Sequence, residues 1–179
     1  LESGRWSSIV GLRYEWVATD AGPVHGYNLD TFPTSGTGGM GNQTRDAALF
    51  NSQSRDRSDG NWDVSWIARF TPADTQAYEF GLAQKTRSPN LYERYTWSSW
   101  QMAAFMNNVV GDGNGYFGDV RLQPEVARTT SMTADWHAAD GGRWSIAVTP
   151  YYTKVDDYID AVQWNSIGNV PRAIPVVDN

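Results

Sequence analysis

The chain has 179 residues, with 20 acidic and 14 basic side chains and a net charge of −6. This balance excludes a general phosphate-binding surface, and with it a nucleic-acid partner, because such surfaces need clustered Lys and Arg. The chain contains no cysteine, which excludes a disulfide framework and a thiolate metal site within this segment.

Apolar residues make up only 40% of the chain, although it contains nine Trp and nine Tyr. This combination fits a membrane protein with aromatic belts at two interfaces and a polar interior. No run approaches the roughly 18 apolar residues that a membrane helix needs. The chain starts at Leu1 without the basic and apolar regions of a signal peptide, so we expect an internal fragment or a processed product.

The first two predicted strands lie at about 7–19 and 61–71. Successive side chains of a strand point to opposite faces, and residues 10–18 alternate between an apolar face and a mostly polar face. The second strand alternates more cleanly. Its apolar face carries Trp62, Val64, Trp66, Ala68 and Phe70.

Three more strands are predicted further along the chain, at about 76–87, 125–138 and 143–160. Each of them again has one apolar face and one polar face. Pro150 lies within the last of these strands. A proline cannot donate a ladder hydrogen bond, so we expect a bulge or weak pairing at this position.

The connections between these strands alternate in length. Residues 71–75 and 138–142 are short connections, whereas 20–60 and 88–121 are long. Long structureless loops are uncommon in compact soluble domains but normal in outer-membrane barrels, which have short periplasmic turns and long extracellular loops. The alternation predicts that the first, third and fifth strands run outward and the other two inward. The tail at 165–179 would then belong to a third extracellular loop.

The pattern predicts an all-β, antiparallel up-and-down transmembrane barrel fragment of about five strands with two long extracellular loops. Opposed charges on the polar faces suit a wet lumen, and several tryptophans lie near strand ends, where interface girdles are found. These tryptophans are Trp16, Trp62, Trp136 and Trp144. The alternative is a soluble β-sandwich that binds glycans through exposed Trp and Tyr, since sandwiches also use two-faced strands.

Two segments carry a family resemblance. Residues 85–95 read KTRSPNLYERY, and residues 118–125 read GDVRLQPE. The pair resembles a signature of TonB-dependent outer-membrane receptors, in which a strand leads into an R-(A/S)-P-x-x-x-E-x-Y loop. In that signature the next strand begins near G-(N/D)-x-x-L-x-P-E. The resemblance spans about 11–160 and includes LRYE at 12–15.

The resemblance implies a partial barrel from the C-terminal half of the receptor's barrel domain. Five strands cannot close the family's barrel of twenty-two, and the plug domain, the TonB box and the terminal strand are not in this chain. The whole protein would lie in the Gram-negative outer membrane, bind a metal or metal chelate outside the cell, and receive energy from the TonB complex through its plug. No cofactor and no enzymatic activity are expected. A passive porin is a third option.

Within the family, residues 89–98, a methionine-bearing loop and residues 111–116 resemble receptors for copper, with ferric siderophore as the next choice of ligand. Met102 and Met106 are four positions apart and share a face if they lie on a helical turn. Thioethers are soft ligands suited to Cu(I), although methionine also fills gaps where a loop packs. His25 and Met40 could complete such a site.

The residues that carry the motif are expected to be structural. The two prolines would shape the loop ends, and the charged side chains would hold the loop in place by ion pairs or hydrogen bonds. The alternative places Arg87 and Glu93 on the ligand path. These motif residues are Arg87, Pro89, Glu93, Pro124 and Glu125.

The remaining polar candidates receive simpler interpretations. For His137, a hydrogen bond in the lumen or exposure is favoured over metal ligation. Asp112, Asn114 and Asp119 offer oxygen ligands for Ca²⁺, but their spacing does not match an EF-hand loop, so a polar turn cluster is expected. Residues 111–115 do not form a phosphate cradle, because no helix beginning with Lys-Ser/Thr follows them.

Overall fold

The computed structural model describes residues 2–26, 43–98, 101–107, 111, 116–139 and 142–161. The chain divides into two compact units. The sheet unit comprises residues 1–16, 60–87 and 125–158, and the loop unit comprises residues 17–59, 88–124 and 159–179. None of the described helices is both long enough and apolar enough to cross a membrane. The predicted third loop at 165–179 lies outside the described residues.

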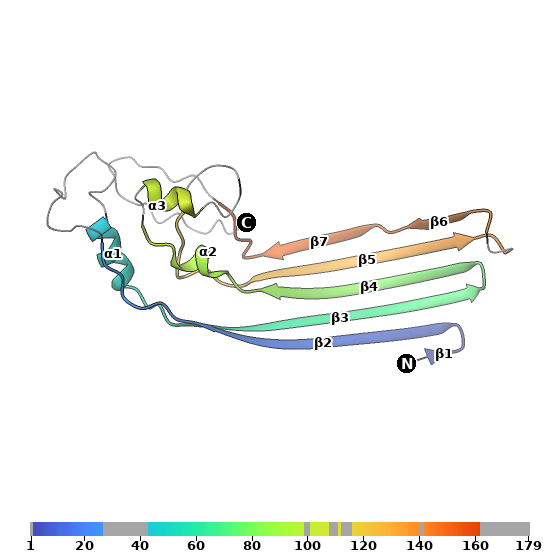
Figure 1. Cartoon of the computed structure of the whole chain (residues 1–179). Coiled ribbons are helices and arrows are strands. Elements are labelled where there is room, and N and C mark those ends of the chain that lie inside the picture. The colour runs from blue at the N-terminus through green and yellow to red at the C-terminus, as the bar shows by residue number, and fades with distance from the viewer. Residues whose placement is uncertain are drawn as a thin grey trace. The chain divides into compact units, whose positions relative to one another are not determined.

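Seven strands form one sheet within the described part of the chain, and they follow one another in chain order (Figure 1). Four of them are long and lie next to one another, and the others are shorter segments at the two edges of the sheet. The strands are β1 (Glu2–Ser3), β2 (Trp6–Thr19), β3 (Arg57–Ala73), β4 (Gln76–Arg87), β5 (Glu125–His137), β6 (Ser145–Val148) and β7 (Tyr151–Asp156). β6 and β7 both pair with β5.

All the neighbouring strands run antiparallel. The pairings β1–β2, β3–β4, β4–β5, β5–β6 and β5–β7 have antiparallel registers. Between β2 and β3, the Thr71 amide donates to the Arg5 carbonyl at 2.8 Å, and the rings of Tyr14 and Trp62 lie 4.7 Å apart, as in an antiparallel pair. The predicted all-β, up-and-down antiparallel fold is confirmed.

Two strands differ in extent from the patterns seen in the sequence. β3 begins at Arg57, before the apolar alternation that starts at Trp62, and its first residues belong to the loop unit. The stretch expected as one strand at 143–160 is divided into β6 and β7 around Pro150. The polar residues at the start of β3 have no periodic signal, so only pairing in the folded chain reveals this extension.

Pro150 removes one hydrogen bond from the ladder between β5 and the last strand segments. Its carbonyl accepts from the Met132 amide at 3.1 Å, but proline has no N–H to return the bond. We expect Pro150→Thr in the full-length receptor to raise the free energy of unfolding by about 1 kcal/mol, the net value of one hydrogen bond. Urea unfolding of both proteins in detergent micelles measures this difference in the free energy of unfolding. Equal or lower stability would show that the irregularity does not weaken the ladder.

The sheet has one apolar face, because directly opposed residues lie on the same face. Phe80 pairs with Ala68 on one side and Met132 on the other, and in the next such rung Leu82 lies between Trp66 and Thr130. The opposite face places Gly81 between Ile67 and Ser131, and Glu79 between Arg69 and Thr133. One face is therefore mainly apolar and the other mainly small, hydroxylated or charged.

The apolar face is exposed rather than packed. Among the described residues, the buried apolar side chains are Ala47, Phe50, Pro89 and Val120, and all four belong to the loop unit. Exposed apolar area costs about 25 cal/mol per Å² relative to burial, so a bare face of this size is unfavourable in water. Large side chains on this face with substantial exposure include Val10, Leu12, Trp16, Phe80, Leu82, Met132, Ile146 and Tyr152.

Candidate functional site

The last five residues of the first motif segment form a short helix, α2 (Leu91–Tyr95), which begins with a capping box. The Glu93 amide donates to the Asn90 side-chain oxygen at 2.9 Å, and the Glu93 carboxylate accepts from the Asn90 amide at 2.7 Å. These bonds satisfy two amides that a helix start otherwise leaves unpaired. A helix of this length is not stable alone in water, so its tertiary contacts decide whether it forms.

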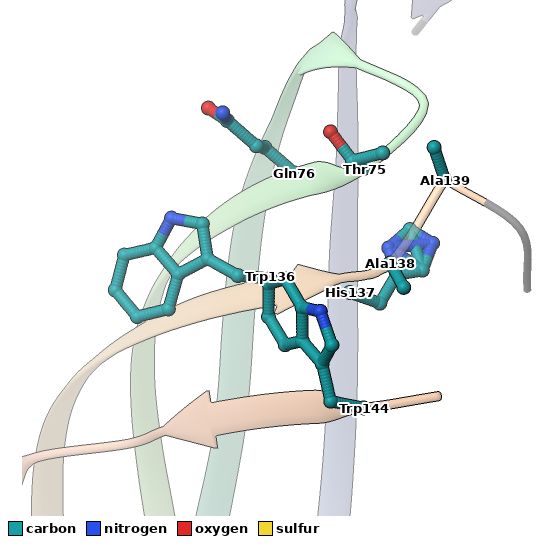
Figure 2. A pocket seen from close by; sticks show the side chains of 7 residues that line it. All are labelled: Thr75, Gln76, Trp136, His137, Ala138, Ala139 and Trp144. Atoms are coloured by element: carbon teal, nitrogen blue, oxygen red, sulfur yellow. The ribbon is translucent and has the colours of Figure 1, made fainter. Parts of the chain in front are cut away.

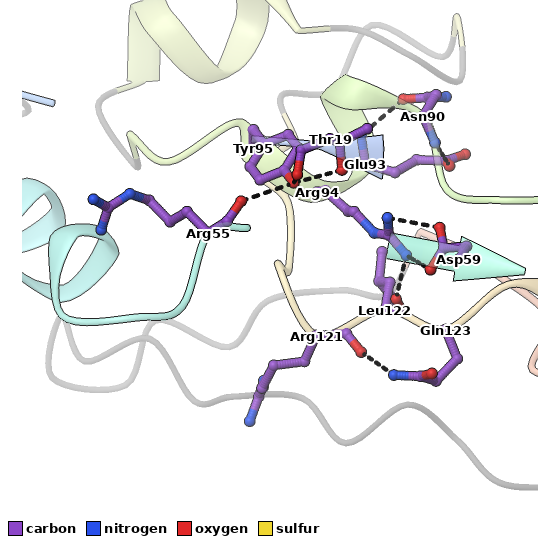
Figure 3. A network of polar contacts seen from close by, with 10 residues as sticks. All are labelled: Thr19, Arg55, Asp59, Asn90, Glu93, Arg94, Tyr95, Arg121, Leu122 and Gln123. Carbon is purple, nitrogen blue, oxygen red and sulfur yellow. Dashed lines mark hydrogen bonds and ion pairs between the residues drawn. The ribbon is translucent and has the colours of Figure 1, made fainter. Parts of the chain in front are cut away.

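Arg94 supplies the strongest of these contacts, with only 2% of its surface exposed. Its Nη2 donates to Asp59 Oδ1 and to the Leu122 carbonyl, both at 2.9 Å, and its Nη1 lies 2.8 Å from Asp59 Oδ2 (Figure 3). A two-pronged guanidinium–carboxylate pair is stronger and more directional than a neutral hydrogen bond. Arg94 therefore joins α2, the start of β3 and the segment before β5.

Tyr95 makes the second contact that joins the two long connections. Its hydroxyl lies 2.7 Å from Thr19 Oγ1 and donates to the Arg55 carbonyl at 3.1 Å (Figure 3). The Arg55 guanidinium in turn donates to the Asn51 carbonyl at 2.7 Å, at the C-terminal end of α1 (Gln43–Asn51). A cation at this end of a helix is favourable because the last carbonyls lack helical partners.

Gly118 lets the chain pass directly beside α2. Its amide donates to the Thr96 carbonyl at 2.7 Å, and the next amide, of Asp119, donates to the Glu93 carbonyl at 2.9 Å. A Cβ at Gly118 would lie 2.3 Å from the Glu93 carbonyl oxygen. A side chain therefore does not fit here without moving backbone, which explains the glycine. We call the contacts of Asp59, Arg94, Tyr95 and Gly118 the loop anchor.

Asp119 forms a local ion pair next to the loop anchor. Its carboxylate accepts from Arg121 Nη2 at 2.6 Å and from the Arg121 amide at 2.8 Å. Burial alone would raise the pKa of Asp119, but these hydrogen bonds outweigh burial and hold the pKa below its ordinary value. The pair therefore contributes stability above the ordinary pKa, and this contribution is lost as the pH falls through the lowered value.

The motif residues fall into two groups in the structure. Arg87 is the last residue of β4 and pairs with Glu125, the first residue of β5, and Arg87 Nε donates to Glu125 Oε2 at 2.6 Å. Glu93 caps α2, and Pro89 is buried just before this helix. Pro124 is half-buried immediately before β5. The motif thus marks both ends of a long connection.

The proposed metal ligands lie in a separate part of the loop unit. Met102 and Met106 belong to α3 (Gln101–Met106), and the Met106 side chain is 81% exposed. His25 is exposed, whereas Met40, Asp112, Asn114 and the side chain of Met102 lie outside the described parts. Within the described residues, no three His, Cys, Asp or Glu side chains gather as a metal site.

A hollow of about 610 Å³ lies beside the short turns of the sheet unit, lined in part by Trp136, His137 and Trp144 (Figure 2). The His137 amide donates to the Thr75 carbonyl at 3.0 Å, and its Nδ1 is buried without a hydrogen-bond partner. Trp136 Nε1 donates to the Tyr78 hydroxyl at 3.2 Å. Indoles at strand ends are typical of an interface belt.

Sequence reasoning missed the loop anchor, although two of its members lie inside the motif. Arg94 and Tyr95 are part of the matched segment, but nothing in a local pattern indicates that they are inward-pointing. Asp59 lies in a stretch rich in Gly, Ser, Asn and Asp, where one more acid carries no signal. The available hint is that Tyr95 occupies the fixed tyrosine of the motif and that Arg94 lies directly before it.

Comparison with known proteins gives one match. A family model described as "TonB dependent receptor-like, beta-barrel" matches residues 1–176 of the chain. No curated protein and no solved structure matches the chain.

Proposed function

Because the chain belongs to the TonB-dependent receptor β-barrel family, we propose that it serves uptake of a metal or metal chelate, with copper as first choice. Proteins of this family are outer-membrane transporters that act with TonB. The single observation that carries the ligand proposal is the exposed thioether of Met106 on α3, four positions after Met102.

The sheet supports the membrane setting of this function. Its apolar face is bare, and the described strands belong to a single sheet rather than to two packed layers. A soluble sandwich would bury that face against a second sheet. In a membrane the same face meets lipid, and the polar face lines the lumen.

The loop anchor supports recognition by the long connections. α3 follows α2 closely in the chain, and α2 is fixed by its capping box and by Arg94. A binding loop with a fixed base loses less conformational entropy when a ligand binds. Residues four positions apart in a helix share a face, and two soft thioether donors on one face would suit Cu(I).

The copper proposal predicts that the double variant Met102→Ala/Met106→Ala of the full-length receptor binds Cu(I) at least about tenfold more weakly, because each thioether would donate to the metal. A competition titration with a Cu(I) chelator measures the affinity. The matched control is Met132→Ala, whose thioether lies on the apolar face of β5 and should leave the affinity unchanged.

Unchanged Cu(I) affinity in the double variant would remove copper as the ligand of these residues. A metal chelate is then the better candidate, because apolar and aromatic side chains are exposed in the loop unit and suit an organic ligand. These side chains are Leu91, Tyr92, Phe105 and Phe117.

A further inference from the structure

Two basic side chains lie at the edge of the apolar face of the sheet unit. Arg128 on β5 pairs directly with Lys154 on β7, and on its other side it pairs with Gln84 on β4. Directly opposed residues share a face, and so do residues two apart. The pair is therefore on the same face as Tyr152 and Leu82, one rung beyond them.

Among the described residues, the charges of this basic pair are only partly compensated. Asp156 accepts a hydrogen bond from Arg128 Nη1 and lies 2.8 Å from Lys154 Nζ, so one carboxylate serves two cations. Arg128 Nε donates to Gln84 Oε1 at 3.1 Å. The two basic side chains remain 55% and 63% exposed. A guanidinium and an ammonium have eight N–H donors together, so donors are left for an anion.

The position of the pair matches the edge of a membrane. Trp136 and Arg128 are eight positions apart on β5, which is about 27 Å along a strand and about 21 Å along the membrane normal at the usual barrel tilt. The apolar band of such barrels is about 25 Å tall. If Trp136 lies at one interface, the long stem of Arg128 carries its charged end into the opposite interface.

The chain connectivity identifies which interface this is. Arg87 and Glu125 pair at the same end of the sheet as Arg128, and the long connection 88–124 begins and ends there. Long connections of these barrels are extracellular. The basic pair therefore faces the outer leaflet of the membrane.

We propose that Arg128 and Lys154 bind a phosphate group of an anionic lipid in the outer leaflet, with the exposed ring of Tyr152 against the acyl chains. The planar guanidinium suits two oxygens of one phosphate, and the ammonium adds a point charge beside it. Aromatic rings are favoured at the same depth. This inference concerns the lipid-facing side of the barrel and does not depend on which ligand is transported.

The test uses the full-length receptor in a nonionic detergent, titrated with a bisphosphorylated glycolipid and with its dephosphorylated form, and native mass spectrometry to measure binding. Wild type should bind the phosphorylated lipid about tenfold more tightly than the dephosphorylated one. Arg128→Gln/Lys154→Gln should lose this preference, and Arg128→Lys should keep part of it. The matched control is Arg69→Gln/Lys85→Gln, which removes the same charges from the opposite face.

Loss of the preference in the first double variant but not in the control supports the proposal. Equal loss in both variants would show a general charge effect, and an unchanged preference in the first would show that another surface binds the lipid. Either result overturns the proposal. Inorganic phosphate at an equal phosphate concentration should not compete, and full competition would overturn the assignment to lipid. Receptor that resists SDS when unheated confirms that each variant is folded.

Discussion

Replacing Gly118 by alanine is expected to lower the free energy of opening of the 88–124 connection by about 3 kcal/mol. The new Cβ would lie 2.3 Å from the Glu93 carbonyl oxygen, and that oxygen belongs to backbone that cannot rotate away. Overpacking of this kind costs about 1–3 kcal/mol, and each hydrogen bond lost adds about 1 kcal/mol. The bonds at risk are those that Gly118 and Asp119 donate to α2 and its end.

Hydrogen exchange of residues 91–96 in the full-length receptor measures this effect. A loss of about 3 kcal/mol corresponds to exchange that is roughly 100-fold faster. The control is Gly22→Ala, also in the loop unit, where a Cβ would meet no atom within 4 Å. It should change the opening free energy by less than about 0.5 kcal/mol. Equal exchange in the two variants would mean that the close approach at Gly118 does not hold α2.

Replacing Arg94 by methionine is expected to have the larger effect, about 3–5 kcal/mol, because it leaves a buried carboxylate without its partner. Asp59 is 8% exposed and receives two contacts from the Arg94 guanidinium. The double variant Arg94→Met/Asp59→Leu should recover most of the loss, because no unpaired buried charge remains. Hydrogen exchange over the same residues gives both values.

The control for the Arg94→Met variant is Arg121→Met. Arg121 also pairs with an aspartate, Asp119, but its side chain is 60% exposed, and exposed pairs contribute only about 0–1 kcal/mol. If Arg94→Met costs no more than Arg121→Met, the buried pair is not what anchors the loops. If the double variant is as unstable as Arg94→Met alone, the loss comes from packing rather than from the unpaired charge.

The strands and their faces were predictable because their signal is local. In β3 the run from Trp62 to Phe70 alternates residue by residue, and the same rule identifies the apolar face of β4 from Tyr78 to Leu82. Such a pattern depends only on the geometry of a strand, in which neighbours point to opposite sides. The family motif is equally local, since it fits within 85–95 and 118–125.

The loop anchor was not predictable because its contacts join residues far apart in the chain. Arg94 meets Asp59 across 35 positions, and the Tyr95 hydroxyl meets Thr19 across 76. Asp59 lies outside the predicted strands, and Thr19 is at the end of one, just beyond the alternating residues 10–18, so no local pattern indicates their partners. The divided strand at Pro150 is an intermediate case, because proline predicts a weak rung but not where the pairing resumes.

The most direct test of the central claim is the environment of side chains along β5 in the full-length receptor, in membranes. This segment contains no cysteine, and in a receptor whose other cysteines, if any, are replaced by serine, a single introduced cysteine carries a spin label at Ser131, Met132, Thr133 or Ala134 in turn. Labels at Met132 and Ala134 should collide mainly with oxygen, which dissolves in lipid. Labels at Ser131 and Thr133 should collide mainly with a water-soluble nickel chelate. The same environment at all four positions would contradict a membrane sheet with one face to lipid and one to the lumen.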